Sequence, residues 1–520
     1  MTNTPASRED SLTTLRESRP WDVLIIGGGA SGLGAAVDAA ARGYRTLLVE
    51  ARDFASGTSS CSTKLIHGGV RYLRQGDVGM VRNALHERTY LLNNAAHLVH
   101  PLAFIIPAWH TVDRIMYAAG LTLYDLLSGG HALEASRSLN RQQVITALPS
   151  LRRAGLCGGI RYWDGQFDDA RLAITLMRTA TDLGASCLNY LPVTRLLKSS
   201  DRVTGAVLRD AESGEEFQIT ARAIINATGV HADSLRRLDE PDAAPLLTPS
   251  QGIHLVVDAD FLPGKQALMI PKTEDGRVMF AIPWQGKVLL GTTDTPRPEL
   301  RQLNDPQPLE AEIDFLLRTA AGVLTRPPTR ADIRSAFAGL RPLIHPDNAD
   351  EKNTAALSRE HAILVSASGL ITVAGGKWTT YRLMAEQVVD RAIEVAGLPN
   401  APCPTQTLKL HGSPNEAAGD AYGTDAPLLA ALPGHDRLLH PNLSCTEAMV
   451  RFAIRHESAR TIEDILARRT RALFHDAFAA EASIERIAEL FAEERQLSPE
   501  QLNTMINAAR KTAARFRLNA

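Results

Sequence analysis

The stretch WDVLIIGGGASGLGAAVDAAARGYRTLLVE, residues 21–50, most constrains what this chain can fold into. Val23 to Ile26 is a short apolar run, as expected of a strand that is buried on both faces. Glycines in the spacing G-x-G-x-x-G follow, and an alanine-rich helix is predicted over residues 30–42. Thr46 to Val49 then forms a second apolar run that ends at Glu50. This order predicts a βαβ unit that holds a dinucleotide.

Each part of this unit has a physical task. Gly27 allows a tight turn, Gly29 lets the backbone approach a pyrophosphate, and Gly32 lets helix and strand pack closely. The amino terminus of the helix, at Ser31, faces the phosphates. Glu50 is placed to accept ribose hydroxyls and would repel a ribose 2′-phosphate. The acid therefore disfavours NADP but leaves both NAD and FAD open.

A second stretch favours FAD over NAD. ARAIINATGV, residues 221–230, is a strand-like run that ends in Ala-Thr-Gly229. It resembles the second fingerprint of FAD-dependent enzymes with a Rossmann-like domain, in which this strand passes back near the cofactor. YLPVTRLL, just before it, contains Val193 where such enzymes often have a strand that covers the adenine. We therefore expect FAD.

The loop GTSSCSTKLIHGGVRYL, residues 57–73, is rich in small hydroxyl and cationic side chains. Its hydroxyls and backbone N–H groups can serve a pyrophosphate or the edge of an isoalloxazine ring. The alternative is a flexible polar turn. Lys64, His67, Arg71 and Tyr72 follow around a glycine pair. Cations beside a tight loop suit an anionic ligand.

This loop resembles the flavin-dependent glycerol-3-phosphate dehydrogenases, whose pattern is roughly T-S-S-x-S-[ST]-K-L-I-H-G-G-x-R-Y-L. The resemblance extends in the same order through RVMFAIPWQGKVLLGTTDT, FAGLRPLIHP, LSREHAI and VAGGKWTTYRLMAE, and so from Trp21 to Ala396. One departure is Val230-His231, where the family often has Pro and then Trp or Phe. These two residues therefore receive no role from the resemblance. The C-terminal region matches none of the family's motifs.

The resemblance implies oxidation of sn-glycerol 3-phosphate to dihydroxyacetone phosphate, with hydride transfer from carbon 2 to FAD. Such a site needs a phosphate clamp, a proton acceptor and cations near the developing oxyanion. We expect His67 to be the base, with His254 as its rival, and Arg341 to lie near the reacting oxygen. Four side chains are assigned to the substrate phosphate, and the last is equally suited to the flavin: Arg71, Tyr72, Arg359 and Lys377.

The expected FAD contacts follow the same motifs, and no metal site is expected. The glycine pair before Lys377 leads into a predicted helix whose N-terminus would stabilise negative charge on the reduced flavin. The expected contacts are Gly27, Gly29, Ser31, Gly32, Glu50, Thr58, Ser59, Ser60, Ser62, Lys64, Leu65, His67, Val193, Gly229, Gly376, Lys377 and Thr379.

The motifs predict an α/β protein with a discontinuous Rossmann-like FAD-binding domain. The resemblance places it in the glutathione-reductase and D-amino-acid-oxidase type. The motifs that would contact the cofactor fall in three blocks of sequence, which we take as the parts of this domain: residues 20–102, 166–237 and 330–397.

Residues 103–165 and 238–329 are expected to form a substrate or cap domain. Alternating short strands in the second of these ranges are typical of an antiparallel sheet. After the proline-rich linker GLPNAPCPT, residues 405–520 read as an all-α domain. Thr446 is a candidate helix cap there, and Ser498 followed by proline is another.

Composition excludes several other classes of protein. The net charge of −2 gives no basic field for nucleic acid. Five scattered cysteines argue against a disulfide framework or a zinc site and fit a reducing compartment. Residues 1–19 lack the apolar core of a signal peptide, and no run of 18 apolar residues occurs. We expect a cytoplasmic protein, peripheral on the inner face of the cell membrane.

The resemblance implies a membrane quinone as electron acceptor, and no second redox motif is visible. PAWHTVDRIMYAAGLTLYDLL, residues 107–127, is interpreted first as a buried or subunit-facing helix, which leaves a homodimer open, and second as a helix on a membrane. The basic run near the end, residues 509–518, either touches anionic lipid or is a solvated helix face.

Three alternatives to the quinone-linked dehydrogenase stay open at this point. One is a glycerol-3-phosphate oxidase that uses oxygen, and another is an amine or amino-acid oxidase of the same fold. The dense positive charge of the predicted site disfavours amine substrates. The third is a non-catalytic flavoprotein, which would have no need of these cations.

Overall fold

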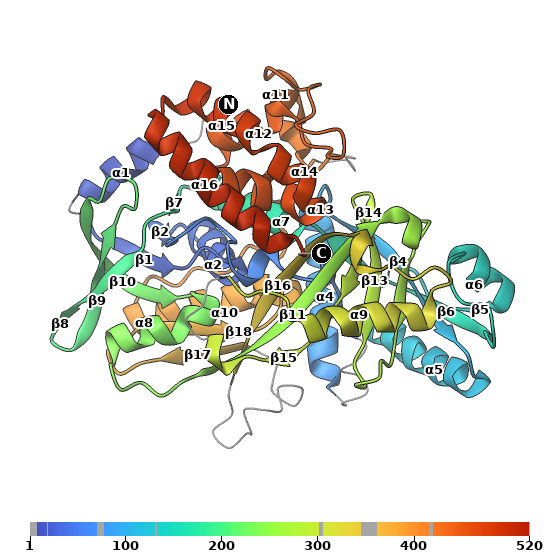
Figure 1. The fold of residues 1–520 in the computed structure, drawn as a ribbon. Helices are drawn as coiled ribbons and strands as arrows, with labels where there is room; N and C mark the ends of the chain where they lie inside the picture. The colour runs from blue at the N-terminus through green and yellow to red at the C-terminus, as the bar shows by residue number, and fades with distance from the viewer. Residues whose placement is uncertain are drawn as a thin grey trace.

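The computed structural model describes residues 8–17, 19–69, 77–129, 133–300, 305–344, 361–414 and 420–518. It shows two sheets side by side, with a cluster of C-terminal helices lying across them (Figure 1).

The first sheet is built around the strand predicted at residues 23–26. In spatial order it contains β17 (His361–Val365), β18 (Ile371–Gly375), β10 (Glu216–Asn226), β1 (Trp21–Ile26), β2 (Thr46–Val49) and β7 (Ser186–Leu188). β18, β10, β1, β2 and β7 run parallel, and β17 is antiparallel to β18. β8 (Val193–Ser199) and β9 (Arg202–Arg209) form an antiparallel extension from β10.

Both faces of this sheet are covered, which explains why its strands are apolar throughout. Val23 and Ile25 pack under α2 (Ala30–Ala41), α7 (Asp169–Asp182) and α10 (Tyr381–Ala396). Leu24 and Ile26 face the other way, toward α1 (Arg8–Arg16), β8 and β9. The predicted strand–helix–strand unit is therefore confirmed, with its helix ending at Ala41.

The second sheet is mainly antiparallel, as predicted. In spatial order it contains β15 (Thr295–Pro296), β11 (Leu247–Asp258), β14 (Lys287–Gly291), β13 (Met279–Trp284), β12 (Ala267–Ile270), β4 (Val99–Ala108), β6 (Gly158–Phe167) and β3 (Leu65–Ile66). β16 (Ile333–Ile344) pairs with β11, and β5 (Arg137–Asn140) pairs with β6. β12 and β4 are parallel to each other. β4 crosses the boundary proposed at residue 102, and the division into domains stays a proposal.

Further helices flank the sheets: α4 (Val78–Asn94), α5 (Thr111–Ser128), α6 (Arg141–Ala147), α8 (Ala232–Asp239) and α9 (Glu310–Val323). α5 lies at the edge of the molecule, beside β5 and β6 (Figure 1). Its buried residues are Leu121, Tyr124 and Ser128. The first interpretation of this helix, buried or subunit-facing, is therefore wrong in its buried part, because the apolar residues lie mainly on the outer face. The subunit-facing part stays a prediction.

The C-terminal region is helical, as predicted. It contains α11 (Ala426–Ala430), α12 (Glu447–His456), α13 (Ala472–His475), α14 (Ala477–Ala482), α15 (Ile484–Arg495) and α16 (Pro499–Phe516). The caps at Thr446 and Ser498 are confirmed, since their hydroxyls accept hydrogen bonds from the backbones of Met449 and Gln501. A short π-helix, Asp464–Arg469, precedes α13. α16 returns to the sheets, where Phe516 packs against Phe474 with ring centroids 5.0 Å apart.

Candidate active site

A cavity of about 540 Å³ begins at the carboxyl ends of the parallel strands and extends under the second sheet. Four strand ends line it, at Gly27 after β1, Glu50 after β2, Ala227 after β10 and Gly375 at the end of β18. Ligands of open α/β sheets bind at this edge, because the strand ends and helix N-termini gather there. The topology therefore brings strand ends from three distant parts of the sequence together in one wall.

The glycine motif brings backbone against backbone at this edge. Gly27 has φ +115°, and a Cβ there would lie 2.5 Å from the Ala227 carbonyl oxygen. A Cβ on Gly32 would lie 1.9 Å from the Gly27 oxygen. These contacts leave the N-terminus of α2 open toward the cavity, with Gly29 and Ser31 in its wall. Such a helix end offers N–H groups to a phosphate.

Glu50 lies at the end of β2, where the sequence predicts a ribose contact. Its carboxylate accepts hydrogen bonds from the backbone N–H of Gly28, at 2.6 Å, and of Arg52, at 2.9 Å. Burial raises the pKa of the Glu50 carboxyl, although these two N–H groups oppose the shift. The side chain lines the cavity and is held in one orientation.

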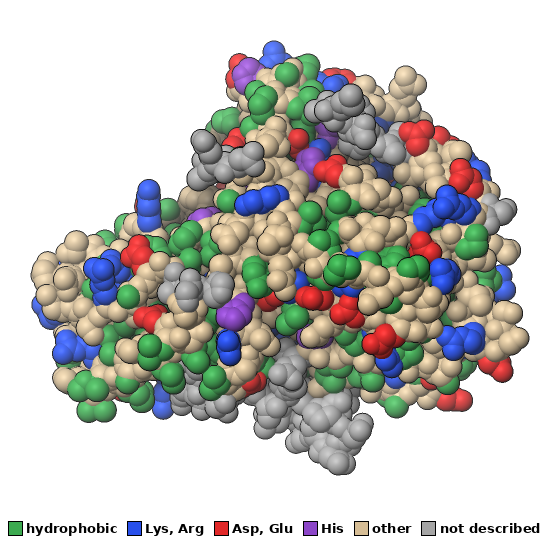
Figure 2. All heavy atoms as spheres, turned by 180° about the vertical axis from the view of Figure 1, so that it is seen from behind, with side chains coloured by type: hydrophobic (Ala, Val, Ile, Leu, Met, Phe, Trp, Pro, Cys, Tyr) green, Lys and Arg blue, Asp and Glu red, His purple; other side chains and the backbone are tan. Residues whose placement is uncertain are grey.

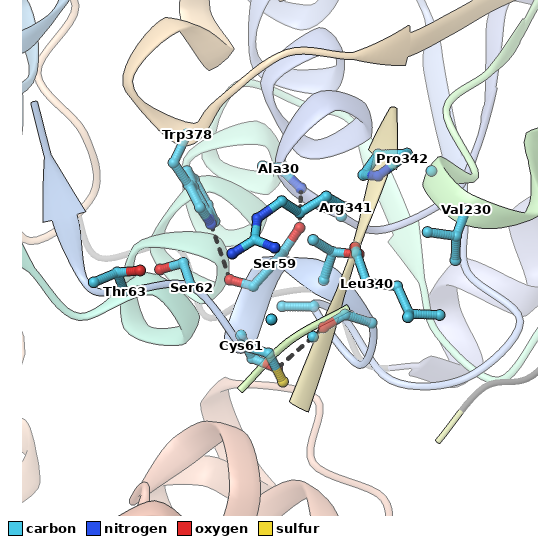
Figure 3. Close-up of a pocket in the computed structure, with 18 of the residues that line it drawn as sticks. Ala30, Ser59, Cys61, Ser62, Thr63, Val230, Leu340, Arg341, Pro342 and Trp378 are labelled. Atoms are coloured by element: carbon cyan, nitrogen blue, oxygen red, sulfur yellow. Dashed lines mark hydrogen bonds between the residues drawn. The ribbon is translucent and has the colours of Figure 1, made fainter. Parts of the chain in front are cut away.

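The hydroxyl-rich loop crosses the N-terminus of α2. The Ser59 hydroxyl accepts a hydrogen bond from the backbone of Ala30 at 2.9 Å, and the Trp378 indole donates to the Ser59 carbonyl at 2.9 Å (Figure 3). Thr58 donates its hydroxyl hydrogen to the Leu340 carbonyl at 2.6 Å. The loop is thus fastened to both the first sheet and β16, and Ser60 and Ser62 follow in the cavity wall.

Lys64 lies beneath this loop and outside the described cavity wall. Its fully buried ammonium group donates to the Ser60 carbonyl at 2.8 Å and pairs with Asp169 at 2.6 Å. Burial lowers the pKa of Lys64 to about 8, against the attraction of Asp169. Ser62 bonds to the same carboxylate through its hydroxyl, at 2.7 Å. The structure therefore gives Lys64 a position that braces the loop.

Val193 is also not brought to the described cavity wall, because it begins β8 and packs on the far face of the sheet. We call the end of the cavity at Glu50 the nucleotide end. The backbone that reaches it lies slightly earlier in the sequence than Val193. The N–H groups of Tyr190 and Leu191 donate to the carbonyls of Arg52 and Glu50, each at 2.8 Å. Leu65, Gly229 and Gly376 do line the cavity.

His67 lies in the cavity wall at the end of the loop. Its backbone N–H donates to the Thr379 hydroxyl at 3.2 Å. The neighbouring Gly68 N–H donates to the hydroxyl of Tyr124 at 2.9 Å, and that hydroxyl donates to Asp164. The backbone around His67 is therefore positioned from two sides. Arg71, Tyr72 and Arg359 lie outside the described residues.

His254 is 2% exposed and lies between a hydroxyl and an aromatic ring. Its Nε2 is 3.0 Å from the Thr63 hydroxyl, and its ring stacks on Phe337 at 5.0 Å between centroids. Burial, with the nearby charges of Lys64 and Arg341, holds the pKa of His254 well below its ordinary value. The imidazole is therefore neutral at physiological pH.

Arg341 projects from β16 into the cavity above the Ser59–Thr63 loop (Figure 3). Its guanidinium donates to the Thr292 hydroxyl and to the Thr293 carbonyl, each at 3.0 Å. It also pairs with Asp294 at 3.3 Å. This fixed fork is suited to an oxyanion, because it needs little reorganisation when charge develops.

Lys377 lines the same cavity after the Gly375-Gly376 turn. Its Nζ atom lies 3.1 Å from the Met80 sulfur. A Cβ on Gly376 would lie 2.3 Å from the Met384 sulfur. The predicted helix follows as a short 3₁₀ turn, Trp378–Thr380, and then α10. The structure therefore places His67, Arg341 and Lys377 on one cavity, together with the rival His254.

Sequence reasoning missed two parts of the wall. One is an apolar and aromatic surface under the second sheet, formed by Phe104, Tyr162, Met269, Val278 and Phe280. The other comes from the C-terminal helices, with Glu463, Arg468, Phe474, Thr512, Arg515 and Phe516. The alternation of β6 would have placed Tyr162 and Asp164 on one face, but no pattern indicates which face meets the cavity.

A long cavity with glycine backbones, a helix N-terminus and an acid at one end, and cations at the other, fits an extended dinucleotide with a reactive ring. The fold and this site together define an FAD-dependent oxidoreductase. Residues 22–382 match the family described as FAD dependent oxidoreductase, and residues 371–502 match the C-terminal domain of alpha-glycerophosphate oxidase.

Individual relatives narrow this class. The chain is 39% identical over 544 residues to the probable mitochondrial glycerol-3-phosphate dehydrogenase of Caenorhabditis elegans, covering 97% of this chain and 74% of that protein. It is 39% identical over 551 residues to the human mitochondrial glycerol-3-phosphate dehydrogenase, covering 98% and 75%. The solved glycerol-3-phosphate dehydrogenase of Bacillus halodurans, complexed with FAD, is 30% identical with a TM-score of 0.80, covering 98% of each chain. The chain belongs to the FAD-dependent glycerol-3-phosphate dehydrogenase family.

Proposed function

We propose that this protein oxidises sn-glycerol 3-phosphate to dihydroxyacetone phosphate and passes the electrons to a membrane quinone. The observation that carries this proposal is a single cavity that joins the dinucleotide edge of the first sheet to Arg341, Lys377 and His67. When bound, FAD supplies the acceptor for the hydride from carbon 2 of the substrate.

Arg341 has the task of stabilising the substrate oxygen as its hydroxyl loses a proton. Asp294 and the Thr292 hydroxyl hold the guanidinium in place at the cavity wall. A preorganised cation of this kind lowers the free energy of an alkoxide-like transition state. Lys377 serves the substrate phosphate or the flavin, and Arg71, Tyr72 and Arg359 are proposed for the phosphate from the resemblance.

His67 is assigned as the base that accepts the proton of the substrate hydroxyl. His254 is neutral, but the environment that lowers its pKa also makes it a weak base. Its Nε2 is already within hydrogen-bond distance of Thr63. His67 also lies at the cavity wall, with its backbone held by Thr379. We therefore keep His67 as the base and give His254 the role of shaping the cavity beside Arg341.

An anaerobic spectrum tests the substrate assignment. Addition of glycerol 3-phosphate should bleach the flavin absorbance of the purified holoenzyme, whereas glycerol or an amino acid at equal concentration should not. No bleaching by glycerol 3-phosphate would overturn the proposed reaction. Bleaching by amino acids would favour the amine or amino-acid oxidase reaction. To assign the acceptor, turnover is measured in air with and without a short-chain quinone. Sustained turnover without quinone would favour the oxidase.

The surface of α5 supports a peripheral contact with a membrane that holds the quinone. Among the described residues, no helix combines the length and apolarity needed to cross a bilayer. The outer face of α5 instead exposes Val112, Ile115, Met116, Leu123 and Leu126. Figure 2 shows green and blue side chains together at this end of the molecule. An apolar helix face of this kind can lie in the interfacial region of a bilayer.

The apolar residues of this face carry the proposal. Arg137 and Arg161 are opposite each other across β5 and β6, on the sheet face that packs toward α6. α5 itself carries Asp113 and Asp125 against Arg114, so its charges give no attraction to an anionic surface. We therefore propose a peripheral location on the inner face of the cell membrane.

Sedimentation with lipid vesicles tests this surface. The holoenzyme should bind phosphatidylcholine vesicles through the apolar residues of α5, and Ile115→Glu with Leu126→Glu should abolish binding. Leu428→Glu is the control, because Leu428 is 43% exposed on α11, away from α5. Unchanged vesicle binding in the double variant would contradict a role of the α5 surface in membrane contact. A change from dimer to monomer in that variant would instead assign α5 to a subunit interface.

A further inference from the structure

The C-terminal helices meet the nucleotide end of the cavity at a ring of charged side chains. The ring consists of Arg52, Asp305, Arg515 and Glu463, in that order, and all four line the cavity. They come from the segment after β2, the segment before α9, α16 and the start of the π-helix. Four separate parts of the chain therefore converge within a few ångströms of one opening.

Charges alternate around this ring. Arg52 lies 3.3 Å from Asp305, and Asp305 lies 2.8 Å from Arg515. Arg515 and Arg52 are each 3.9 Å from Glu463. The side chains are between 23% and 39% exposed, so the ring forms a rim at the cavity surface.

The Glu463 corner is fastened from inside the C-terminal region. Arg468 donates to Glu463 at 3.0 Å, and the Thr512 hydroxyl donates to the same carboxylate at 2.8 Å. Burial alone would raise the pKa of Glu463, but Arg468, Thr512 and Arg52 hold it below its ordinary value. Arg468 is itself anchored on the buried Asp53 at 2.5 Å. This corner therefore stays charged and in place.

The ring is adjacent to the position predicted for the adenosine part of FAD. The backbone of Arg52 donates to Glu50, the expected ribose ligand, while its side chain forms part of the rim. α16 is held over this end because Arg515 binds the rim and Phe516 packs on Phe474. The Arg515–Asp305 pair therefore links α16 to the segment before α9 at this end of the cavity.

We propose that this ring is the wall of the FAD site at the nucleotide end. Through the ring, the C-terminal domain closes the site over the adenosine half of FAD and so retains the cofactor. The role is independent of which substrate is oxidised at the other end. It gives the C-terminal domain a function in FAD binding that involves no contact with the reacting atoms.

The test compares FAD release from holoenzyme variants, followed by the fluorescence of the freed flavin. Arg515→Gln should speed release about fivefold to tenfold, since partly exposed ion pairs are individually weak. Because salt screens exposed charges, sodium chloride should speed release from the unaltered protein and have a smaller effect on the variant. Arg510→Gln is the matched control: Arg510 is on the same helix and pairs with Glu485 outside the cavity.

A second measurement distinguishes loss of the ring from a general destabilisation of the FAD site. FMN lacks the adenosine half of FAD, so its binding to the full-length apoprotein should agree within about twofold between Arg515→Gln and the unaltered chain if the rim acts only on that half. An unchanged rate of FAD release would overturn the proposal, and so would an equal loss of FMN binding. Neither result bears on the proposed oxidation of glycerol 3-phosphate, because that reaction is measured separately by flavin bleaching.

Discussion

The two ends of the cavity are built in different ways. The backbone cradle of the nucleotide end comes from one continuous stretch, in which Gly27, Gly32 and Glu50 follow each other within a single βαβ unit. The substrate end takes His67 from a loop, Arg341 from β16 and Lys377 from the turn before α10. The first end depends on backbone contacts that tolerate no side chain, and the second on side chains held by distant neighbours. Substitutions should therefore affect binding at one end and chemistry at the other.

The largest effect is expected at the glycine motif. Gly32→Val would place a side chain 1.9 Å from the Gly27 oxygen, a contact that backbone movement must relieve. We expect the purified variant to contain no flavin, measured by absorbance after denaturation. Gly322→Val on α9 is the control, because a Cβ there meets nothing within 4 Å. Retention of FAD in Gly32→Val would mean that the backbone contact does not define the nucleotide end.

Arg341→Ala tests the other end. The rate of flavin reduction by glycerol 3-phosphate should fall by about 10² to 10³, the usual cost of removing one oxyanion donor. FAD content should remain within twofold of the unaltered protein, since Thr292, Thr293 and Asp294, which hold Arg341, lie outside the βαβ unit. Arg334→Ala, on the same strand but paired with Asp258, is the matched control. Equal losses of FAD content and of the rate of flavin reduction would contradict the proposal that one end serves binding and the other serves chemistry.

Glu50→Ala should weaken FAD binding about tenfold to a hundredfold, because hydrogen bonds to charged groups contribute about 1.5–3 kcal/mol. The backbone N–H groups of Gly28 and Arg52, which donate to the Glu50 carboxylate, would lose their acceptor, and so would the ribose hydroxyls. Isothermal titration of the apoprotein with FAD measures the effect. Asp22→Ala is the comparison, since Asp22 also accepts a backbone N–H, at 2.9 Å from Arg45, but at the opposite edge of the sheet. Similar affinities for the two variants would rule out a ribose role for Glu50.

The sequence predicts these two ends unequally, for a physical reason. Local spacing is sufficient for the βαβ unit, because strand, turn and helix are neighbours along the chain. Lys64 shows the limit: it stands inside the motif that carries the resemblance, yet its ammonium group is buried against Asp169, more than a hundred residues away. Whether a cation faces a ligand or a buried carboxylate depends on tertiary packing. The ring at Arg515 was missed for the same reason, since its four members share no local pattern.

The smallest effect is expected at His254, and a pH profile compares this residue with His67. Because the pKa of His254 is held well below its ordinary value, this ring stays neutral across the range in which the enzyme can be assayed. His254→Asn should therefore lower the rate of flavin reduction only a few-fold and leave the shape of its pH profile unchanged. If His67 is the base, protonation of its ring makes the rate fall as the pH is lowered, and His67→Asn should remove that fall. Stopped-flow reduction between about pH 5.5 and 9 distinguishes the two, because a base must titrate within that range to shape the profile. A profile changed by His254→Asn but not by His67→Asn would exchange their roles, and the proton acceptor would then lie on the second sheet beside Arg341.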